Sequence, residues 1–235
     1  VLDGVTATAN GNSGIETNGN NTHDTVTLKN STLNVPNGFG IYFPSSGTLT
    51  LDNSTVNAKT MGVQVCAGSL NITGAGTAIT VTGDAVPKTE NDGAIQDGAA
   101  ISIVNRKGYK GLVDVTITEG TFKANGTNAA VKAYDWENNK ETNFTEPTKV
   151  SISGGTFTGT VINGEGGTIA EGVSIPNLKF IVTFDNEGTK ITEIIVKGGK
   201  LTEPNPAPTK GGYTLAGWYY DNNGSKTEWN FGTDR

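Results

Sequence analysis

The chain has 235 residues, a formal net charge of −6 at pH 7 and 33 glycines, and 17% of its residues are charged. This length suffices for one large domain or two modest ones with a sizeable core. The acidic balance argues against a nucleic-acid or anionic-membrane partner, and arginine occurs only at Arg106 and Arg235, so no cluster exists to hold phosphates.

A ten-residue pattern recurs along the first two thirds of the chain. It begins at Val26, Leu49, Val115 and Val150, with a looser copy at Leu70. In each copy apolar residues at the first and third positions enclose a polar one, a period of two that turns one face of a strand toward a core. A polar or glycine corner follows, and Thr with an apolar residue then starts a second short strand. Asn and Gly tolerate the left-handed backbone that a sharp corner needs.

A second pattern lies between the copies, a small residue followed by an apolar one. Each repeat unit therefore contains two or three short strands. The first three copies begin 23 and 21 residues apart, and the later ones 45 and 35 residues apart. The spacing of 45 fits two turns or one turn with a large loop, and the spacing of 35 fits one turn with an insertion at 134–148. The small–apolar pairs are Gly14-Ile15, Gly40-Ile41, Gly62-Val63, Ala100-Ile101 and Ala130-Val131.

A fixed period of this size indicates a solenoid, and the absence of a helical pattern favours a parallel β-helix with coils about 4.8 Å apart. We expect right-handed coiling, because strand crossovers have that hand, and ladders of Thr, Ser and Asn side chains along the stack. Over residues 1–175 the pattern resembles the pectate-lyase-like β-helix superfamily and the β-helical domains of bacterial surface proteins. The predicted fold class is all-β: a right-handed single-stranded parallel β-helix over 1–178, followed by a small C-terminal module.

A first insertion, at 83–98, is polar and acidic. Asp84, Glu90, Asp92 and Asp97 offer oxygen ligands for calcium, but their spacing does not match an EF-hand. A solvated acidic loop is the favoured alternative, so these residues stay weak calcium candidates. We predict no metal and no cofactor.

The second insertion carries the candidate ligand-binding residues. Tyr134, Asp135, Trp136 and Asn138 combine ring faces with hydrogen-bonding groups, which suits a sugar, and Tyr109 is a weaker candidate by the same logic. The alternative interpretation is that the rings pack the insertion against the stack.

No catalytic group is predicted. Pectate lyases need calcium-binding carboxylates and an arginine base, and Arg106 lies in a loop. Inverting hydrolysis needs two carboxyl groups about 6.5–9.5 Å apart, but the corner that matches His23-Asp24 holds Ser45-Ser46-Gly47. We therefore interpret His23 and Asp24 as a corner before a strand. The lone Cys66 is interpreted as a small core residue, not a nucleophile.

The composition changes near Phe180, after Pro176, which suits a terminating edge. The segment that follows contains Val182-Thr-Phe184, prolines before Thr209-Lys210, Gly212-Tyr213 and Gly217-Trp218-Tyr219. It resembles the Listeria–Bacteroides repeat, the B-repeat of internalin-type surface proteins.

That resemblance implies a β-grasp, ubiquitin-like module over 179–235, with Phe184, Tyr213 and Trp218 in its core. The sequence departs from the family at Leu215, where an aromatic residue is usual, and it stops at Arg235 before the usual last strand. The final strand is therefore missing or the module closes differently. We expect this module to cover the open edge of the β-helix or to link it to further modules.

These observations predict a non-enzymatic, extracellular bacterial protein, secreted or on the cell surface. The β-helix would serve as a rod and display platform for adhesion or recognition, with glycans or host or microbial surface proteins as partners. Two alternatives remain: a carbohydrate-active enzyme, either polysaccharide lyase or glycoside hydrolase, whose site the sequence does not reveal, and a structural spacer. Because Val1 begins within a strand pattern, we expect a trimmed or excised chain. No run is long enough to insert into a membrane.

Overall fold

The chain folds as strands and loops. The computed structural model describes residues 1–19, 23–90, 92–109, 111–145, 149–163, 168–169, 178–196, 199–222 and 224–234. These residues contain no α-helix, in agreement with the predicted all-β class. Within them, nothing helical has the length and apolar character required to cross a bilayer. Pro176, the expected terminating residue, lies outside the described residues.

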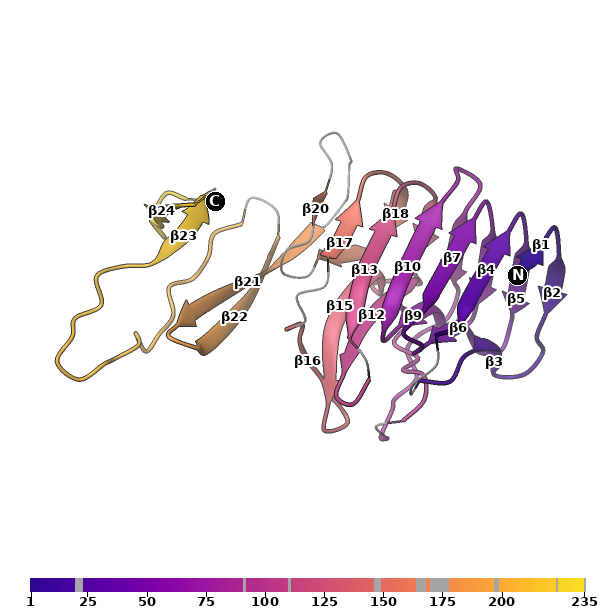
Figure 1. Ribbon diagram of the computed structural model, residues 1–235, viewed down its shortest axis with the longest axis horizontal. Coiled ribbons are helices and arrows are strands. Elements are labelled where there is room, and N and C mark those ends of the chain that lie inside the picture. The colour runs from indigo at the N-terminus through magenta and orange to yellow at the C-terminus, as the bar shows by residue number, and fades with distance from the viewer. Residues whose placement is uncertain are drawn as a thin grey trace.

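Three sheets of stacked parallel strands make up most of the molecule (Figure 1). The first sheet contains β1 (Leu2–Asp3), β4 (Thr25–Lys29), β7 (Thr48–Asp52), β10 (Gly68–Thr73), β13 (Leu112–Ile117), β17 (Lys149–Ile152) and β20 (Thr168–Ile169). The second contains β2 (Thr6–Thr8), β5 (Thr32–Val35), β8 (Thr55–Ala58), β11 (Ala78–Val81), β14 (Thr121–Lys123) and β18 (Thr156–Thr158). The third contains β3 (Ser13–Glu16), β6 (Phe39–Phe43), β9 (Met61–Val65), β12 (Ile101–Arg106), β15 (Ala129–Glu137) and β19 (Thr160–Asn163).

Successive strands along the chain enter the three sheets in turn, which is the arrangement of a β-solenoid. The strand pairing aligns Leu49 with Leu70 and Leu70 with Val115, so the repeat seen in the sequence is the coil of the structure. The segment between β10 and β13 is one coil with a large loop, because these two strands pair directly. Likewise β13 pairs directly with β17, so the 35-residue spacing is one coil with an insertion.

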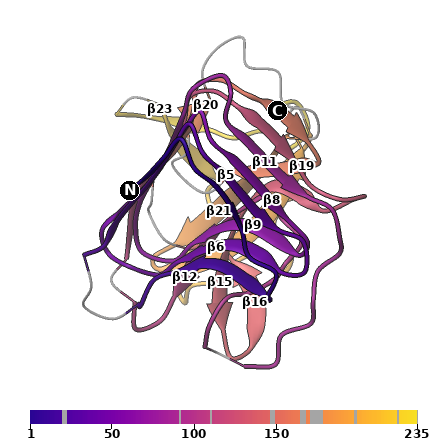
Figure 2. The same ribbon diagram turned by 90° about the vertical axis from the view of Figure 1, so that its right-hand side faces the viewer.

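The apolar residues of the repeat fill the interior of the coils. Figure 2 shows the stacked coils from the N-terminal end. Strand β7 alternates between half-buried and buried residues, as the period of two predicts. In the second sheet, Phe122 and Phe157 occupy the equivalent position in adjacent coils, with ring centroids 5.1 Å apart. Burial of these side chains is the main stabilising contribution, since a fully buried Leu, Ile or Phe gives about 1.5–3 kcal/mol.

A ladder of hydroxyl side chains lines the corner between the first and second sheets. The Ser54 hydroxyl accepts a hydrogen bond from the Ser31 backbone N–H at 3.1 Å and donates to the Asp52 carbonyl at 2.9 Å. Asn30 and Asn53 precede these serines with φ of 48° and 46°, the left-handed conformation that the corner needs. The predicted side-chain ladders are therefore confirmed at this corner.

The start of the third sheet brings backbones into close contact. A Cβ on Gly40 would lie 2.4 Å from the carbonyl oxygen of Gly62, and one on Gly62 would lie 2.3 Å from that of Ala100. In both cases the obstacle is backbone, which cannot rotate away. This explains why the small–apolar pattern begins with glycine in these coils.

The insertion after Tyr134 is a β-hairpin. Strand β15 runs past the end of the regular coil and pairs antiparallel with β16 (Lys140–Asn143). Asn138 and Asn139 form the two-residue turn, with φ of 52° and 60°. Positive φ at both central residues is the type I′ geometry that hairpin twist favours.

The C-terminal part consists of two antiparallel hairpins. The first joins β21 (Leu178–Asn186) to β22 (Thr189–Val196), and the second joins β23 (Tyr219–Asn222) to β24 (Ser225–Glu228). Strand β21 also pairs with β19 through its first three residues, so the first hairpin continues the third sheet and extends beyond the stacked coils (Figure 1).

The aromatic residues expected in the core of this part divide into two groups. Phe184 is buried and packs edge-on against Trp218, with ring centroids 5.1 Å apart, and the Phe231 ring centroid lies 5.9 Å from that of Phe184. The expectation for Tyr213 is wrong, because 73% of this residue is exposed. Its backbone N–H closes a surface turn on the Lys210 carbonyl, which keeps the ring away from Phe184.

Candidate functional site

The outer face of the third sheet is covered by other residues of the chain. In the first sheet, by contrast, the outward residues of β7 are half-buried. All residues of β6 and β9 are buried, and most of β12 is too. The cover is the first insertion, residues 83–98 without residue 91, which we call the strap. Beneath it lies a second apolar cluster, separate from the interior of the coils, formed by Phe39, Tyr42, Met61, Cys66, Ile95, Val104 and Tyr134.

The strap is attached to the sheet by side-chain amides. Gln64 on β9 donates from Nε2 to the Ile95 carbonyl at 2.8 Å and accepts from the Ile95 N–H at 2.9 Å. Thr60 donates to the Gln96 side chain at 2.6 Å. Because Gln64 is fully buried, these bonds are made away from water, where leaving either partner unpaired costs about 1–3 kcal/mol.

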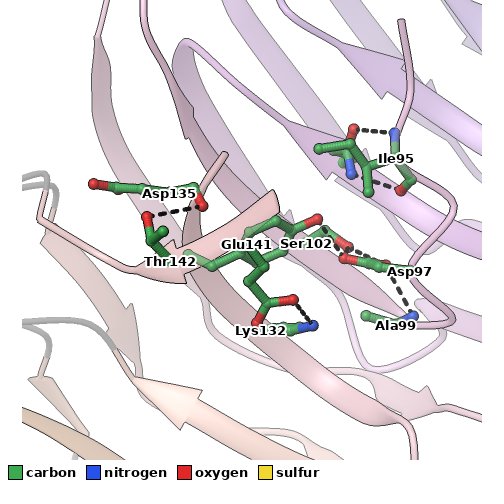
Figure 3. Close-up of polar contacts among 10 residues, drawn as sticks. Ile95, Asp97, Ala99, Ser102, Lys132, Asp135, Glu141 and Thr142 are labelled. Carbon is green, nitrogen blue, oxygen red and sulfur yellow. Dashed lines mark hydrogen bonds and ion pairs between the residues drawn. The ribbon is translucent and has the colours of Figure 1, made fainter. Parts of the chain in front are cut away.

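Asp97 closes the strap onto the following coil (Figure 3). Its carboxylate accepts hydrogen bonds from the Ala99 N–H at 3.1 Å, the Ser102 hydroxyl at 2.8 Å and the Tyr134 hydroxyl at 2.8 Å. Burial raises the pKa of Asp97 above its ordinary value, although Lys132 and these donors lower it. Asp97, one of the four acidic calcium candidates, is therefore a hydrogen-bond acceptor within the scaffold.

The other calcium candidates do not converge. Asp84 accepts from the Asn125 amide at 3.0 Å, and Asp92 accepts from the N–H of Gly93 beside it at 2.8 Å. Glu90 is exposed. Across the described ranges, no three His, Cys, Asp or Glu side chains are close enough to share a metal ion.

Arg106 connects the strap to the turn after β12. Its side chain is buried, and Nη1 donates to the Tyr42 hydroxyl and to the Gly93 carbonyl, each at 2.8 Å. The guanidinium carbon lies 5.5 Å from the centre of the Tyr109 ring, and the Tyr109 and Tyr42 hydroxyls are 3.2 Å apart. Arg106, which sequence reasoning placed in a loop, is thus the last residue of a strand and fixes the position of Tyr109.

Cys66 lies in the same covered layer. Burial raises the pKa of its thiol to about 12, with Arg106 nearby acting in the opposite direction. The thiol is therefore protonated at neutral pH, and a protonated thiol is a poor nucleophile. This agrees with its interpretation as a core residue.

A pocket of about 220 Å³ opens where the turn after β12 meets the tip of the β15–β16 hairpin. The strand pairing places Arg106 beside Trp136, which brings the turn after β12 next to the hairpin. The pocket is lined by Arg106, Lys107, Tyr109, Trp136, Glu137 and Asn138.

Three of the five predicted ligand-binding residues line this pocket: Tyr109, Trp136 and Asn138. The structure does not bring the other two into it. Tyr134 is buried under the strap, with its hydroxyl on Asp97. Asp135 accepts hydrogen bonds from the Asn105 amide at 3.0 Å and the Thr145 N–H at 3.1 Å, which fixes the base of the hairpin.

Sequence reasoning missed three charged residues that line the pocket, Arg106, Lys107 and Glu137. One indication was present: the Asn138-Asn139 pair after a run of alternating residues is typical of a hairpin turn. That turn would have placed Glu137 and Trp136 at a projecting tip.

The His23 corner is a structural feature. Asp24 donates its backbone N–H to the Ser45 hydroxyl at 2.8 Å, and the Ser46 hydroxyl lies 2.9 Å from His23 Nδ1. Neighbouring coils are thus joined here by short polar side chains, as expected for a corner before a strand.

Comparisons with known proteins gave one family match and one curated relative that are informative here. Residues 180–235 match the family of the Listeria-Bacteroides repeat domain. Internalin H of Listeria monocytogenes is 30% identical over 161 residues, which cover 57% of this chain and 29% of internalin H. The chain therefore spans less than a third of that relative's length. No solved structure matches the chain.

Proposed function

We propose that this chain is a non-enzymatic rod of a bacterial cell-surface or secreted protein, and that the rod displays a recognition site. The observation that carries the proposal is the position of the pocket. It lies where the turn after β12 meets the β15–β16 hairpin, which is inserted in an otherwise regular stack, and insertions on one face of a solenoid commonly form its binding surface. The likeness to internalin H and the Listeria-Bacteroides repeat support an extracellular location.

The pocket favours glycans as the partner, and proteins that present such groups are the second class. Tyr109 and Trp136 offer ring faces, and Asn138 and Lys107 offer donors at the rim. Ligand sites for drug-sized molecules measure about 300–1,000 Å³. A pocket of about 220 Å³ therefore suits one sugar unit of a chain that continues into solvent.

The finer features of the fold belong to the same proposal. We infer right-handed coiling from the general chirality of parallel crossovers. We also infer a β-grasp-type module from residue 179 onward, supported by the repeat match. Since β21 starts at Leu178 and pairs with β19, this module and the rod share a sheet, which suits a rigid display arm that links further modules.

A glycan array tests recognition. The labelled chain is expected to bind a defined subset of glycans, and Trp136→Ala is expected to weaken this binding by about tenfold or more through loss of the stacking face. Tyr213→Ala, which removes an exposed ring in the C-terminal part, is the matched control and should bind normally. An array without binding, or binding indifferent to Trp136, would contradict recognition at this pocket.

Two further measurements test the remaining parts. Protease treatment of intact cells of the source bacterium should remove the chain if it is surface-exposed, and a secreted form should be found in the medium. Incubation with a panel of polysaccharides should release neither reducing ends nor unsaturated products. Release of either product would replace the display proposal with a carbohydrate-active enzyme.

A further inference from the structure

The C-terminal part contains a pocket that the proposed function does not use. Its volume is about 510 Å³, within the range of about 300–1,000 Å³ that is typical of small-molecule sites. None of its lining residues belongs to the glycan pocket beside the β15–β16 hairpin. We call it the C-terminal pocket, and its wall includes Glu203, Trp218, Glu228, Trp229, Phe231 and Gly232.

Aromatic rings form one part of this wall. Trp218 and Trp229 come from the two ends of the β23–β24 hairpin, where the Trp229 N–H donates to the Trp218 carbonyl at 2.7 Å. Other rings hold both side chains: Trp218 packs edge-on against Phe184, and Trp229 packs edge-on against Tyr220. Both tryptophans and Phe231 are half-buried, so part of each residue stays accessible. The aromatic part of the wall is therefore held in place before a ligand binds.

Two carboxylates, of Glu203 and Glu228, form the charged part of the wall, and both residues are exposed. Glu228 ends β24, and its Oε1 would lie 3.0 Å from a Cβ on Gly217, so this carboxylate lies close to the backbone that leads into β23. Within the described ranges, neither carboxylate forms an ion pair or a hydrogen bond. None of the lining residues is a lysine or an arginine. The lining side chains therefore carry two negative charges and no positive one.

One cation lies beside the C-terminal pocket. Lys200 donates from Nζ to the Gly232 carbonyl at 2.8 Å, so a neutral group of the wall holds it, and not either carboxylate. Lys200 offsets one of the two negative charges and leaves an excess of one, on a chain whose overall charge is −6. Local potential of this sign attracts cations.

The chain itself shows how a ring and a carboxylate hold a cation together. Two lysines each lie 4.8 Å from the centre of a tyrosine ring and form an ion pair with a glutamate. They are Lys132, with Tyr134 and Glu141, and Lys210, with Tyr213 and Glu187. The negative face of the ring attracts the cation, most strongly when the ring is an indole, and the carboxylate adds charge-assisted hydrogen bonds. The C-terminal pocket combines the same two kinds of group, with two indoles and two carboxylates.

We propose that the C-terminal pocket binds a cationic side chain, lysine or arginine, of a partner protein. The cationic group pairs with the Glu203 and Glu228 carboxylates, and its aliphatic stem lies against Trp218 and Trp229, as long charged side chains commonly bury their stems on apolar surface. The carboxylates decide the class of ligand, because they accept hydrogen bonds, donate none and bind a cation more strongly than a neutral hydroxyl. The site is separate from the glycan pocket, so either can exist without the other.

Capped amino acids test the charge requirement. Nα-acetyl-lysine N-methylamide and its arginine equivalent carry the cation, and Nα-acetyl-norleucine N-methylamide has the lysine stem without the ammonium. Each is titrated into the isotope-labelled full chain, and the N–H resonances of the three indoles are followed by NMR. Trp218 and Trp229 should shift, whereas Trp136 in the glycan pocket should not. At least one cationic probe should bind about fivefold or more tighter than the norleucine probe, and added salt should weaken only the cationic probes. The tighter of the two cationic probes identifies the side chain.

Three exposed residues supply variants with opposite signs. Glu203→Gln and Glu228→Gln should each weaken binding of the cationic probe about threefold, and Lys200→Gln should strengthen it by a similar factor, the range for partly exposed charges. The affinity for the norleucine probe should not change in any of them. Glu119→Gln, an exposed carboxylate in the turn between β13 and β14, is the matched control for net charge and should leave all affinities unchanged. Thermal melting of each variant checks that the fold is intact.

The outcomes separate this inference from the proposed function. Equal binding of the lysine and norleucine probes, or no binding of either cationic probe, overturns it. Unchanged affinity in both Glu203→Gln and Glu228→Gln overturns it as well. If methyl α-glucoside shifts the Trp218 and Trp229 resonances and the cationic probes do not, the C-terminal pocket is a sugar site instead. Each of these results leaves the glycan array and its Trp136→Ala variant unaffected, and these alone decide recognition at the glycan pocket.

Discussion

The interior of the coils and the outer face of the third sheet are built on different principles. In the interior, one apolar position recurs in coil after coil, as in Leu49, Leu70 and Val115. On the outer face each contact is made once, between a particular side chain and the strap, as with Gln64 on Ile95 or Asp97 on Tyr134. Residues that recur with the period therefore determine the coiled rod, whereas residues that break the period determine the features that occur only once, such as the contacts of the strap.

The two regions also differ in what stabilises them. The interior depends on apolar burial and close packing, which do not respond to pH near neutrality. The outer face includes a half-buried carboxylate, Asp97, whose pKa is raised by desolvation, so the stability of this face is linked to protonation. Substitutions can therefore be chosen that affect one region and not the other.

The largest expected effect comes from a charge in the interior. Ile117 is fully buried between Ile72 and Ile152 of the adjacent coils. Ile117→Asp should lower the free energy of unfolding by more than about 4 kcal/mol, since an unpaired carboxylate has no partner there. Denaturant unfolding measures the loss. Thr116→Asp, one residue earlier on the half-buried outward face, should cost far less, and equal losses in both variants would contradict the assigned inward face.

A backbone contact gives the next largest effect. Gly62→Ala places a Cβ 2.3 Å from the Ala100 carbonyl oxygen and 2.4 Å from the Ile79 side chain. Relieving this overlap requires the coils to separate, and we expect a loss of about 3 kcal/mol in unfolding free energy. Gly11→Ala, where no atom lies within 4 Å of the added carbon, is the control and should unfold like the parent chain.

The corner ladder gives a smaller effect. Ser54→Ala removes the acceptor of the Ser31 N–H, which is buried, and should cost about 1–2 kcal/mol. Ser69→Ala, on the half-buried face of β10, removes a hydroxyl outside this ladder and serves as the comparison. Similar melting temperatures for both variants would mean that the ladder is not a stabilising feature.

The outer face should respond to pH through Asp97, whose pKa is raised by burial. A raised carboxyl pKa means that the folded state holds its proton more tightly than the unfolded state does. The stabilisation that comes from this proton is fully present below the pKa of the unfolded state, about 3.9. It is lost as the pH rises through the pKa of the folded state. Asp97→Asn should therefore flatten the decline in unfolding free energy above that pH, whereas Asp114→Asn, an exposed carboxyl on β13, should not. A profile unchanged by Asp97→Asn would show that the carboxyl is not linked to folding.

The sequence predicted the interior well because its signal is periodic. The spacing of Val26, Leu49 and Leu70 identified equivalent positions that pair in the structure, and the glycines before Ile41 and Val63 marked the close contacts of the third sheet. The corners formed by hydroxyl and amide side chains were predictable for the same reason, because each coil repeats the same turn.

The site was predicted in part, because it lies in residues that do not repeat. Composition singled out Trp136 and Asn138, but not the side chains that the fold brings to them from elsewhere. Arg106 reaches the pocket only because β12 and β15 are adjacent and in register. Tyr134 was predicted to bind ligand for the same reason as Trp136, as an aromatic residue of the second insertion, yet the strap covers it. No local pattern states which outward residue a distant loop will cover.

Spin-label distances test the stacking of coils most directly. Pairs of nitroxides at Thr27 and Thr116, and at Thr27 and Ser151, placed in a Cys66→Ser background, occupy the same strand position in coils three and four steps apart. With about 4.8 Å between coils, the second distance should exceed the first by about 5 Å, at about 19 Å against about 14 Å. Equal distances, or a shorter second distance, would show that the repeats do not stack as successive coils.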